Sequence, residues 1–162
     1  ALNTYYFGGI MAIIRGGITM KISTRGRYSL RMMLDLAIHY SDNYIALKDI
    51  SARQNISKKY LEQIIPFLNR SGLLITNRGH MGGYRLSKKP SDITVKDILL
   101  SAEGSLAPVS CMETEPNMCD KCETCMTLPI YKELYDVINN YLSSVSLQDI
   151  IDRSSGSYDY SI

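Results

Sequence analysis

A pair of short helical patterns separated by a tight turn most restricts how this chain can fold. Residues 46–55 place Leu47 and Ile50 on one face of a short helix. A second helix is expected from Ser57, a favourable N-cap residue, and Gly72 ends it. Its apolar positions recur at helical spacing and are Leu61, Ile64, Ile65 and Leu68. Two short helices connected in this way form a helix-turn-helix.

The segments on either side complete a small domain. Residues 23–40 favour a helix, with an apolar stripe formed by Leu30, Met33, Leu34, Ala37 and Ile38. Residues 73–86 contain two extended stretches around a glycine-rich turn, which predicts a β-hairpin whose tip carries Arg78 and His80. A hairpin directly after a helix-turn-helix forms a wing. The predicted fold is therefore mainly α with a small β-hairpin wing, and the winged helix-turn-helix domain spans residues 20–103.

Charge divides the chain into two halves. Residues 20–100 contain fourteen Lys and Arg against six Asp and Glu, a balance of +8, whereas residues 101–162 contain three against ten, a balance of −7. The basic half indicates contact with a polyanion such as DNA. A solvated basic face is the alternative reading. The longest apolar runs fall far short of the roughly 20 residues that a membrane-spanning helix needs, which argues against a membrane protein.

A second region follows the domain: a cysteine-rich loop at 104–126, helices at 127–153 and a tail at 154–162. The first of these helices has a long apolar stripe formed by Ile130, Leu134, Val137, Ile138, Tyr141, Leu142 and Val145. Such a stripe has to be buried, either on its own domain or against a second chain. We expect a long dimerisation helix, because two recognition helices about 34 Å apart match one turn of DNA.

The first nineteen residues differ from the rest of the chain. They carry one charge, Arg15, and lack the basic start and the cleavage site of a signal peptide. The sequence Arg15-Gly16-Gly17 can be encoded by a purine-rich ribosome-binding sequence just upstream of a start codon at Met20. We therefore expect residues 1–19 to be a leader or a non-native extension. A genuine N-terminal arm is the alternative.

All four cysteines of the chain lie within fifteen positions, at Cys111, Cys119, Cys122 and Cys125. A chain without a signal peptide is expected in the cytoplasm, where thiols stay reduced, so disulfides are not expected. No strand precedes the C-x-x-C sequence as it does in thioredoxin-like redox sites. Four thiolates could bind zinc, although zinc modules usually have two separated C-x-x-C pairs. Soft thiolate ligands also suit an iron–sulfur cluster.

Three stretches, MKISTRGRYSLRMMLDLA, ISARQNISKKYLEQI and NRGHMGGYRLSK, resemble the Rrf-two family of bacterial winged-helix regulators, which has IscR-like and NsrR-like members. The resemblance covers about residues 20–153. It implies that the second helix of the helix-turn-helix enters the major groove and that the wing arginine reaches the adjacent minor groove. The implied DNA contacts are Ser57, Lys58, Tyr60, Glu62 and Arg78. From their charge and their position in the chain, we expect further DNA contacts at Lys21, Ser23, Arg25, Arg27, Lys59 and His80.

The same resemblance implies an iron–sulfur cluster, of the two-iron, two-sulfur (2Fe-2S) type. Three cysteines match those that bind this cluster in IscR-like members, namely Cys111, Cys119 and Cys125. The histidine that supplies the fourth ligand there is replaced by Leu128, and the acid that does so in NsrR-like members is matched by Arg27. Cys122 is additional, and we expect it to complete a set of four thiolates. The C-x-x-C-x-x-C spacing also resembles bacterial ferredoxins, so a four-iron cluster is the alternative.

These observations predict a cytoplasmic, homodimeric transcriptional regulator that binds double-stranded promoter DNA, with a repressor favoured. Its signal would be iron–sulfur, redox or nitric-oxide status, sensed through the cluster. One alternative is a zinc- or thiol-based redox protein whose basic face is incidental. Another is a cysteine-metabolism regulator of the same family without a cluster. No nucleophile–base pair stands out in the sequence, and no enzyme is expected.

Overall fold

The computed structural model describes residues 21–79, 82–114, 116–117 and 119–156. The predicted leader at 1–19, the start at Met20, and His80 lie outside the described residues. The helices are α1 (Thr24–Ile38), α2 (Leu47–Gln54), α3 (Lys58–Arg70), α4 (Val95–Glu103), α5 (Leu128–Ser143) and α6 (Leu147–Gly156). Strands β1 (Leu74–Asn77) and β2 (Gly83–Leu86) form the hairpin, and short 3₁₀ turns lie at Pro90–Asp92 and Ser110–Met112.

The helix-turn-helix forms as the sequence predicts. Helix α2 ends at Gln54, and its C-cap Asn55 turns the chain with a φ of 50°. Ile56, between the two helices, is 3% exposed. Ser57 caps α3, with its side-chain oxygen accepting a hydrogen bond of 3.2 Å from the amide of Tyr60. Helix α3 continues through Pro66 to Arg70. The predicted apolar face of α3 is buried at all four positions, Leu61, Ile64, Ile65 and Leu68.

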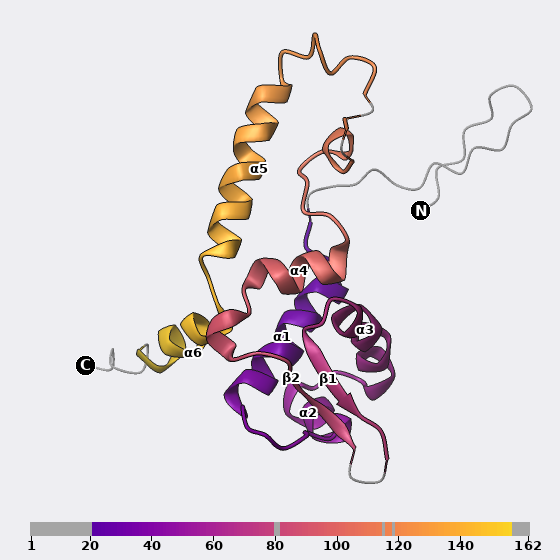
Figure 1. Cartoon of the computed structure of the whole chain (residues 1–162), viewed down its shortest axis with the longest axis vertical. Coiled ribbons are helices and arrows are strands. Elements are labelled where there is room, and N and C mark those ends of the chain that lie inside the picture. Colours follow the sequence, from indigo (N-terminus) through magenta and orange to yellow (C-terminus); the bar gives the residue numbers. More distant parts are fainter. Residues whose placement is uncertain (1–20, 80–81, 115, 118, 157–162) are drawn as a thin grey trace, which may run out of the picture.

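Helix α1 is the centre of the domain. It packs against α2, α3, α4, α6 and β2, and these elements surround it in Figure 1. Met32, Met33 and Leu36 of α1 are at most 1% exposed, and they share one core with residues of the helix-turn-helix, the hairpin and α6. The prediction was wrong for Ile38, which is 58% exposed. Ile38 is the last residue of α1, and the elements that cover the rest of the stripe do not cover this end of the helix.

The wing is a two-stranded antiparallel hairpin in the register Leu74↔Leu86 to Asn77↔Gly83. It is attached to the domain through Ile45, which exchanges two backbone hydrogen bonds of 2.9 Å with Tyr84. A Cβ atom at Gly83 would collide with the carbonyl oxygen of Ile45, so only glycine allows this close approach. The predicted hairpin is confirmed.

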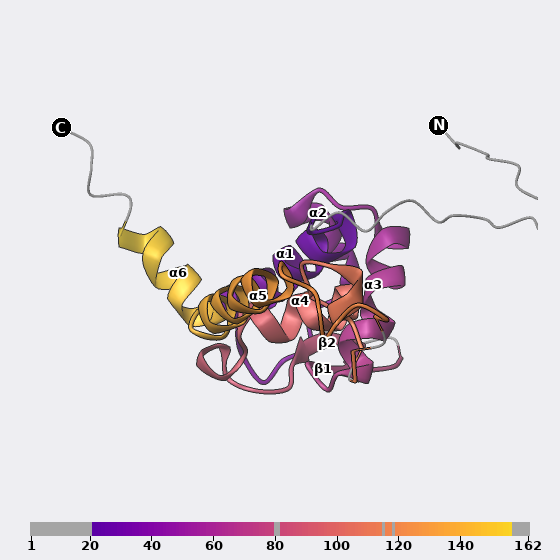
Figure 2. The same ribbon diagram turned by 90° about the horizontal axis from the view of Figure 1, so that it is seen from above.

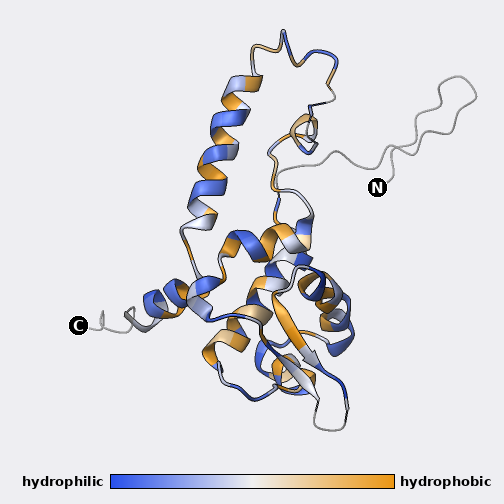
Figure 3. Cartoon of the chain, in the orientation of Figure 1, coloured by the Kyte–Doolittle hydropathy of each residue, from blue (hydrophilic) through white to orange (hydrophobic). Residues whose placement is uncertain are grey.

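Helix α5 extends away from the domain, with the cysteine loop at its far end (Figure 1), and Figure 2 shows this helix nearly end-on. Its hydropathy alternates between polar and apolar positions along the whole helix (Figure 3). Four apolar side chains are at least 40% exposed, namely Ile130, Leu134, Val137 and Tyr141. None of the described helices combines the length and the apolar character needed to cross a membrane.

The end of the α5 stripe differs from the prediction. Val145 lies beyond α5, is 5% exposed, and packs with Val95 and Leu99 of α4. Its carbonyl accepts a hydrogen bond of 2.8 Å from the amide of Val95. Val145 therefore belongs to the core of its own chain and not to a surface for a second one. Helix α6 then returns to the domain through the fully buried Leu147, and it runs to Gly156, three residues past the predicted boundary.

A buried carboxylate joins α1 to α2. Asp35 is 1% exposed and accepts two hydrogen bonds from the guanidinium of Arg53, at 2.9 and 2.7 Å, and one from Gln54 at 3.1 Å. Burial by itself raises the pKa of Asp35, but the hydrogen bonds from Arg53 and Gln54 and the charge of Arg53 outweigh that effect. The pKa of Asp35 therefore lies below its ordinary value.

Replacing Arg53 by alanine should lower the free energy of unfolding by about 3 kcal/mol at neutral pH, because it leaves a buried carboxylate without its cation. The depressed pKa of Asp35 means that the pair stabilises the parent above the unfolded pKa of roughly 4, and that this stability is lost as the pH falls through the folded pKa. The difference between parent and variant should therefore shrink in acid. Urea unfolding followed by circular dichroism measures it.

The matched control is Asp42→Ala. It removes the surface ion pair with Arg85, at 3.5 Å, in which the Asp42 side chain is fully exposed. Its unfolding midpoint should match that of the parent. An Arg53→Ala loss as small as that of the control, or one that stays constant from neutral to acid pH, would contradict the assignment.

Candidate nucleic-acid interface and cysteine loop

The first turn of α3 presents polar side chains to solvent. Ser57, Lys58, Lys59 and Glu62 are all exposed. Within the described residues neither lysine takes part in a salt bridge. Free cationic side chains at the start of a helix can reach phosphates and the acceptor atoms of guanine, and a carboxylate can accept a hydrogen bond from cytosine. The exposed end of α3 therefore has the chemistry needed to contact a duplex.

Tyr60 is half-buried and connects α3 to α1. Its ring packs edge-on against Tyr28, with ring centroids 5.3 Å apart and an interplanar angle of 77°. This contact fixes the position of the ring. Only the exposed part of the Tyr60 side chain can therefore contact a partner. The ring also forms one wall of a cleft between α1 and α3.

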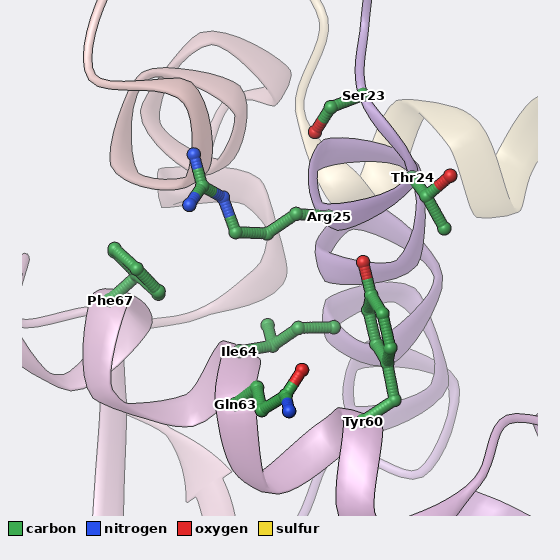
Figure 4. A pocket seen from close by; sticks show the side chains of 7 residues that line it. All are labelled: Ser23, Thr24, Arg25, Tyr60, Gln63, Ile64 and Phe67. Atoms are coloured by element: carbon green, nitrogen blue, oxygen red, sulfur yellow. The ribbon is translucent and has the colours of Figure 1, made fainter. Parts of the chain in front are cut away.

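That cleft has a volume of about 520 Å³ and is shown in Figure 4. It is lined by Ser23, Thr24, Arg25, Tyr60, Gln63, Ile64 and Phe67. Arg25 extends from α1 across the cleft, and its guanidinium carbon lies 4.6 Å from the centre of the Phe67 ring. Arg70 approaches the same ring at 4.8 Å. Cation–π contacts with Phe67 thus hold two positive charges beside the α1–α3 cleft.

The segment before α1 and the first turn of α1 contain further predicted contacts. Lys21 and Arg27 are exposed, and Arg27 donates a hydrogen bond of 3.1 Å to the hydroxyl of Thr24. Ser23 differs from these, because its amide and its hydroxyl both donate to the carboxylate of Glu103, at 2.9 and 2.8 Å. Both donors of Ser23 are thus already used inside the chain.

The wing supplies the last of these side chains. Arg78 follows β1 and is exposed. In Figure 1 the end of β1, which Arg78 follows, and the first turn of α1 lie at opposite ends of the domain. The predicted contacts therefore come from three elements spread along one domain and not from a single pocket.

The cysteine loop has little regular structure. All four thiols are free and partly exposed. The amide of Cys122 donates to the carbonyl of Cys119 at 3.0 Å, which closes one turn. The Cys125 thiol lies 3.4 Å from the hydroxyl of Thr127, and the hydrogen bond from Thr127 lowers the pKa of Cys125. Leu128, at the position of the family histidine, is 8% exposed.

The four thiols do not form a ready metal site. Within the described ranges, no three side chains of His, Cys, Asp or Glu are gathered as a metal ion would require. The donor set itself fits an iron–sulfur cluster, because its four soft ligands are all free and lie in a loop with few backbone constraints.

Several residues at these sites were not predicted from the sequence. Thr24, Gln63 and Phe67 line the cleft, and Glu103 bonds to the start of α1. Phe67 had a weak local signal, since it is an aromatic residue three positions before Arg70 on the same helix. The pairing of Ser23 with Glu103 joins residues 80 positions apart, and no periodic pattern indicates it.

A helix-turn-helix followed by a wing, with free basic side chains on the second helix, defines the class of winged-helix DNA-binding proteins. Comparison with known proteins agrees with this class. Residues 22–153 match the family model of Rrf2, described as an iron-dependent transcriptional regulator. The chain belongs to the Rrf2 family, which confirms the resemblance seen in the sequence.

Individual relatives support the same assignment. The chain is 39% identical over 136 residues to protein rrf2 of Nitratidesulfovibrio vulgaris, covering 84% of this chain and 90% of that protein. It is 36% identical to IscR of Photorhabdus laumondii, covering 83% and 80%. These are transcriptional regulators and not enzymes, as the sequence predicts.

Two solved structures share the fold. One is IscR of T. potens, with a TM-score of 0.69, 33% identity, and coverage of 88% of this chain and 93% of that one. The other is CymR, the global cysteine regulator of B. subtilis, with a TM-score of 0.66, 34% identity, and coverage of 82% and 97%. The mainly α fold with a hairpin wing is thereby confirmed.

Proposed function

We propose that this regulator binds promoter DNA as a homodimer in the cytoplasm and represses transcription, and that its cysteine loop carries an iron–sulfur cluster. The observation that carries the DNA-binding part is the exposed first turn of α3, where Lys58 and Lys59 have no salt-bridge partner among the described residues. In the proposed complex α3 lies in the major groove, and Arg78 of the wing reaches the narrow minor groove beside it.

The other contacts fall into two groups. Ser57, Tyr60 and Glu62 accompany the lysines at the base edges, whereas Lys21, Arg25 and Arg27 contact phosphates from the start of α1. Phosphate contacts position the protein, and base contacts specify the sequence. The elements that carry these residues, β1, α3 and α1, are spread along one domain (Figure 1), and this supports a footprint that follows the DNA backbone.

The proposed dimer forms through α5. Ile130, Leu134, Val137 and Tyr141 are exposed along one side of this helix. Ile138 and Tyr141 also line a groove of about 710 Å³ together with Leu99, Leu106 and Leu142. An apolar face that continues into a groove at the domain is the kind of surface that a second copy of the chain would cover.

The proposed cluster would be held by Cys111, Cys119, Cys122 and Cys125. The description of the family as iron-dependent and the similarity to IscR proteins support this assignment. When bound, an iron–sulfur cluster supplies a centre that responds to oxidants and to nitric oxide. This chain's own part is to bring four separated loop positions together at the start of α5. Ordering the loop in this way would alter the dimer and so its DNA affinity, by about 1–3 kcal/mol in typical couplings between two sites.

A second candidate follows from the similarity to CymR. In this reading the loop senses thiol chemistry without a metal, as in a regulator of cysteine metabolism. Four free, partly exposed thiols that are not gathered together are compatible with it. The cluster remains our first proposal, because the extra Cys122 completes a four-thiolate donor set.

For the DNA interface, Arg78→Ala should weaken binding to a specific promoter by about 1–3 kcal/mol and relax sequence preference near the wing. Lys59→Ala should weaken binding to every sequence and reduce the salt dependence of log K by about one unit, because one phosphate contact is lost. Fluorescence anisotropy titrations over a range of KCl concentrations measure both effects. Lys121→Ala, in the cysteine loop, is the control and should bind like the parent. Parent-like binding by both test variants would show that the interface lies elsewhere.

For the dimer, Val137→Glu should raise the dissociation constant by roughly thirtyfold or more, since burying an unpaired carboxylate costs at least about 2 kcal/mol. Sedimentation velocity at a series of protein concentrations measures this shift. Lys132→Glu is the control, because a rotation of about 100° per residue places it on the opposite side of α5. Equal behaviour of the two variants would contradict an α5 interface.

For the cluster, protein purified without oxygen should absorb visible light and contain iron and acid-labile sulfide. Serine at Cys111, Cys119 or Cys125 should abolish both, and Cys122→Ser should lose or destabilise the cluster because one iron is left without a thiolate. Thr124→Ala, between two ligands, should keep the parent's iron content. Unchanged iron in Cys122→Ser would reject Cys122 as a ligand. Colourless protein with one zinc per chain would reject the cluster, and colourless metal-free protein would favour thiol sensing.

A further inference from the structure

The first turn of α1 is held by a carboxylate from another helix. Glu103, the last residue of α4, accepts hydrogen bonds from the amide of Ser23 at 2.9 Å and from its hydroxyl at 2.8 Å. The same hydroxyl oxygen accepts the amide of Gly26 at 3.2 Å and so caps α1. Ser23 thus links the backbone of α1 to the end of α4.

Charge makes this link stronger than an ordinary cap. The first turn of α1 contains no acidic residue of its own. A carboxylate near a helix N-terminus is stabilised by the helix dipole, and here Glu103 supplies it from α4. Hydrogen bonds that involve an ionised group are also stronger than those between neutral groups.

Gly26 is required for the same contact. It is buried, and a Cβ atom at this position would collide with the Glu103 carboxylate and lie 3.1 Å from Ile22. The φ angle of Gly26 is not in the left-handed region. Glycine is therefore favoured here because a side chain would lack space, and not because of the backbone conformation. Ser23, Gly26 and Glu103 therefore form one three-residue joint, called the α1–α4 joint below.

The joint lies between the two functional parts of the chain. On one side it fixes the segment with Lys21, Arg25 and Arg27. On the other side, Glu103 is followed at once by Gly104, where φ is 82° and the cysteine loop begins. A change in the loop can therefore reach the start of α1 through a single residue. We propose that Glu103 is a positioning residue, which holds the start of α1 in place for DNA and transmits the state of the cysteine loop to it.

This inference rests on the proposed DNA contacts of α1. Removing Glu103 can strengthen or weaken DNA binding, and the direction of this change distinguishes a positioning role from a purely electrostatic one. Loss of a negative charge close to a basic face should strengthen the binding of a polyanion. Loss of a positioning contact should weaken it. Glu113 is the matched control, because it lines the same groove as Glu103 and has no hydrogen bond to Ser23 among the described residues.

The first measurement is the affinity for a mixed-sequence DNA duplex. Glu103→Ala should bind at least about fivefold more weakly than the parent, the lower end of couplings between sites. Glu103→Gln should keep most of the affinity, since its amide oxygen can accept the same two hydrogen bonds. Glu113→Ala should bind as well as the parent or better. Weaker binding by Glu113→Ala to the same extent, or tighter binding by Glu103→Ala, would overturn the proposal.

Gly26→Ala provides an independent test. Alanine favours helix over glycine, so this change should not unfold α1, yet its methyl group displaces the Glu103 carboxylate. It should therefore weaken DNA binding as Glu103→Ala does. Because both variants break one joint, the double variant should be no weaker than either single one. Additive losses would show that the two residues act separately.

Hydrogen exchange tests the joint without DNA. The amides of Ser23 and Gly26 should exchange faster in Glu103→Ala and Gly26→Ala, and at the parental rate in Glu113→Ala. Alkylating the four cysteines with N-ethylmaleimide should change the exchange of the Ser23 amide in the parent but not in Glu103→Ala. A change of equal size in both proteins, or in neither, would overturn the transmitting role. Since these readouts need no duplex, a misplaced DNA interface and a failed joint give different results.

Discussion

Burial of α1 is the constraint on which the rest of this structure depends. Its apolar stripe packs against α2, α3, α4 and α6 at once, with Met32, Met33 and Leu36 almost fully excluded from water. Because each neighbour contacts the same helix, the helix-turn-helix, the wing and the return of α6 take their positions from α1. The Asp35–Arg53 pair adds a polar fixed point between α1 and α2 within this core.

Helix α5 differs from every other helix of the domain. Its apolar side chains, such as Ile130 and Val137, are more than 60% exposed, whereas the residues that follow it, Val145 and Leu147, are buried in the domain. The chain is thus anchored to the domain at the base of α5, and one side of the helix stays exposed. The proposed dimer uses this exposed side, and the proposed cluster lies in the loop before the helix. The DNA-binding half stays packed around α1, and the cysteine loop connects it to α5 by way of α4.

Local patterns explain which features could be predicted. The N-cap at Ser57, the apolar face of α3 from Leu61 to Leu68, and the stop at Gly72 each depend on residues within a few positions, and all are present in the structure. The predictions failed at the ends of helices. Ile38 is the last residue of α1 and is exposed, whereas Val145 follows the end of α5 and is buried because the chain has turned back to the domain there.

The sequence by itself therefore determined the order and type of the elements, the basic and acidic halves, and the supply of four soft ligands in one loop. Those properties follow from residue chemistry and from spacing along the chain. Only the tertiary structure decided which side chains from different helices come into contact. The packing of α4 on α1 places Glu103 against Ser23 and beside Gly26, where a Cβ atom would displace the carboxylate, and the packing of α3 beside α1 brings Arg25 over Phe67. Such contacts depend on the distance and angle between helices, and no periodicity within either helix encodes them.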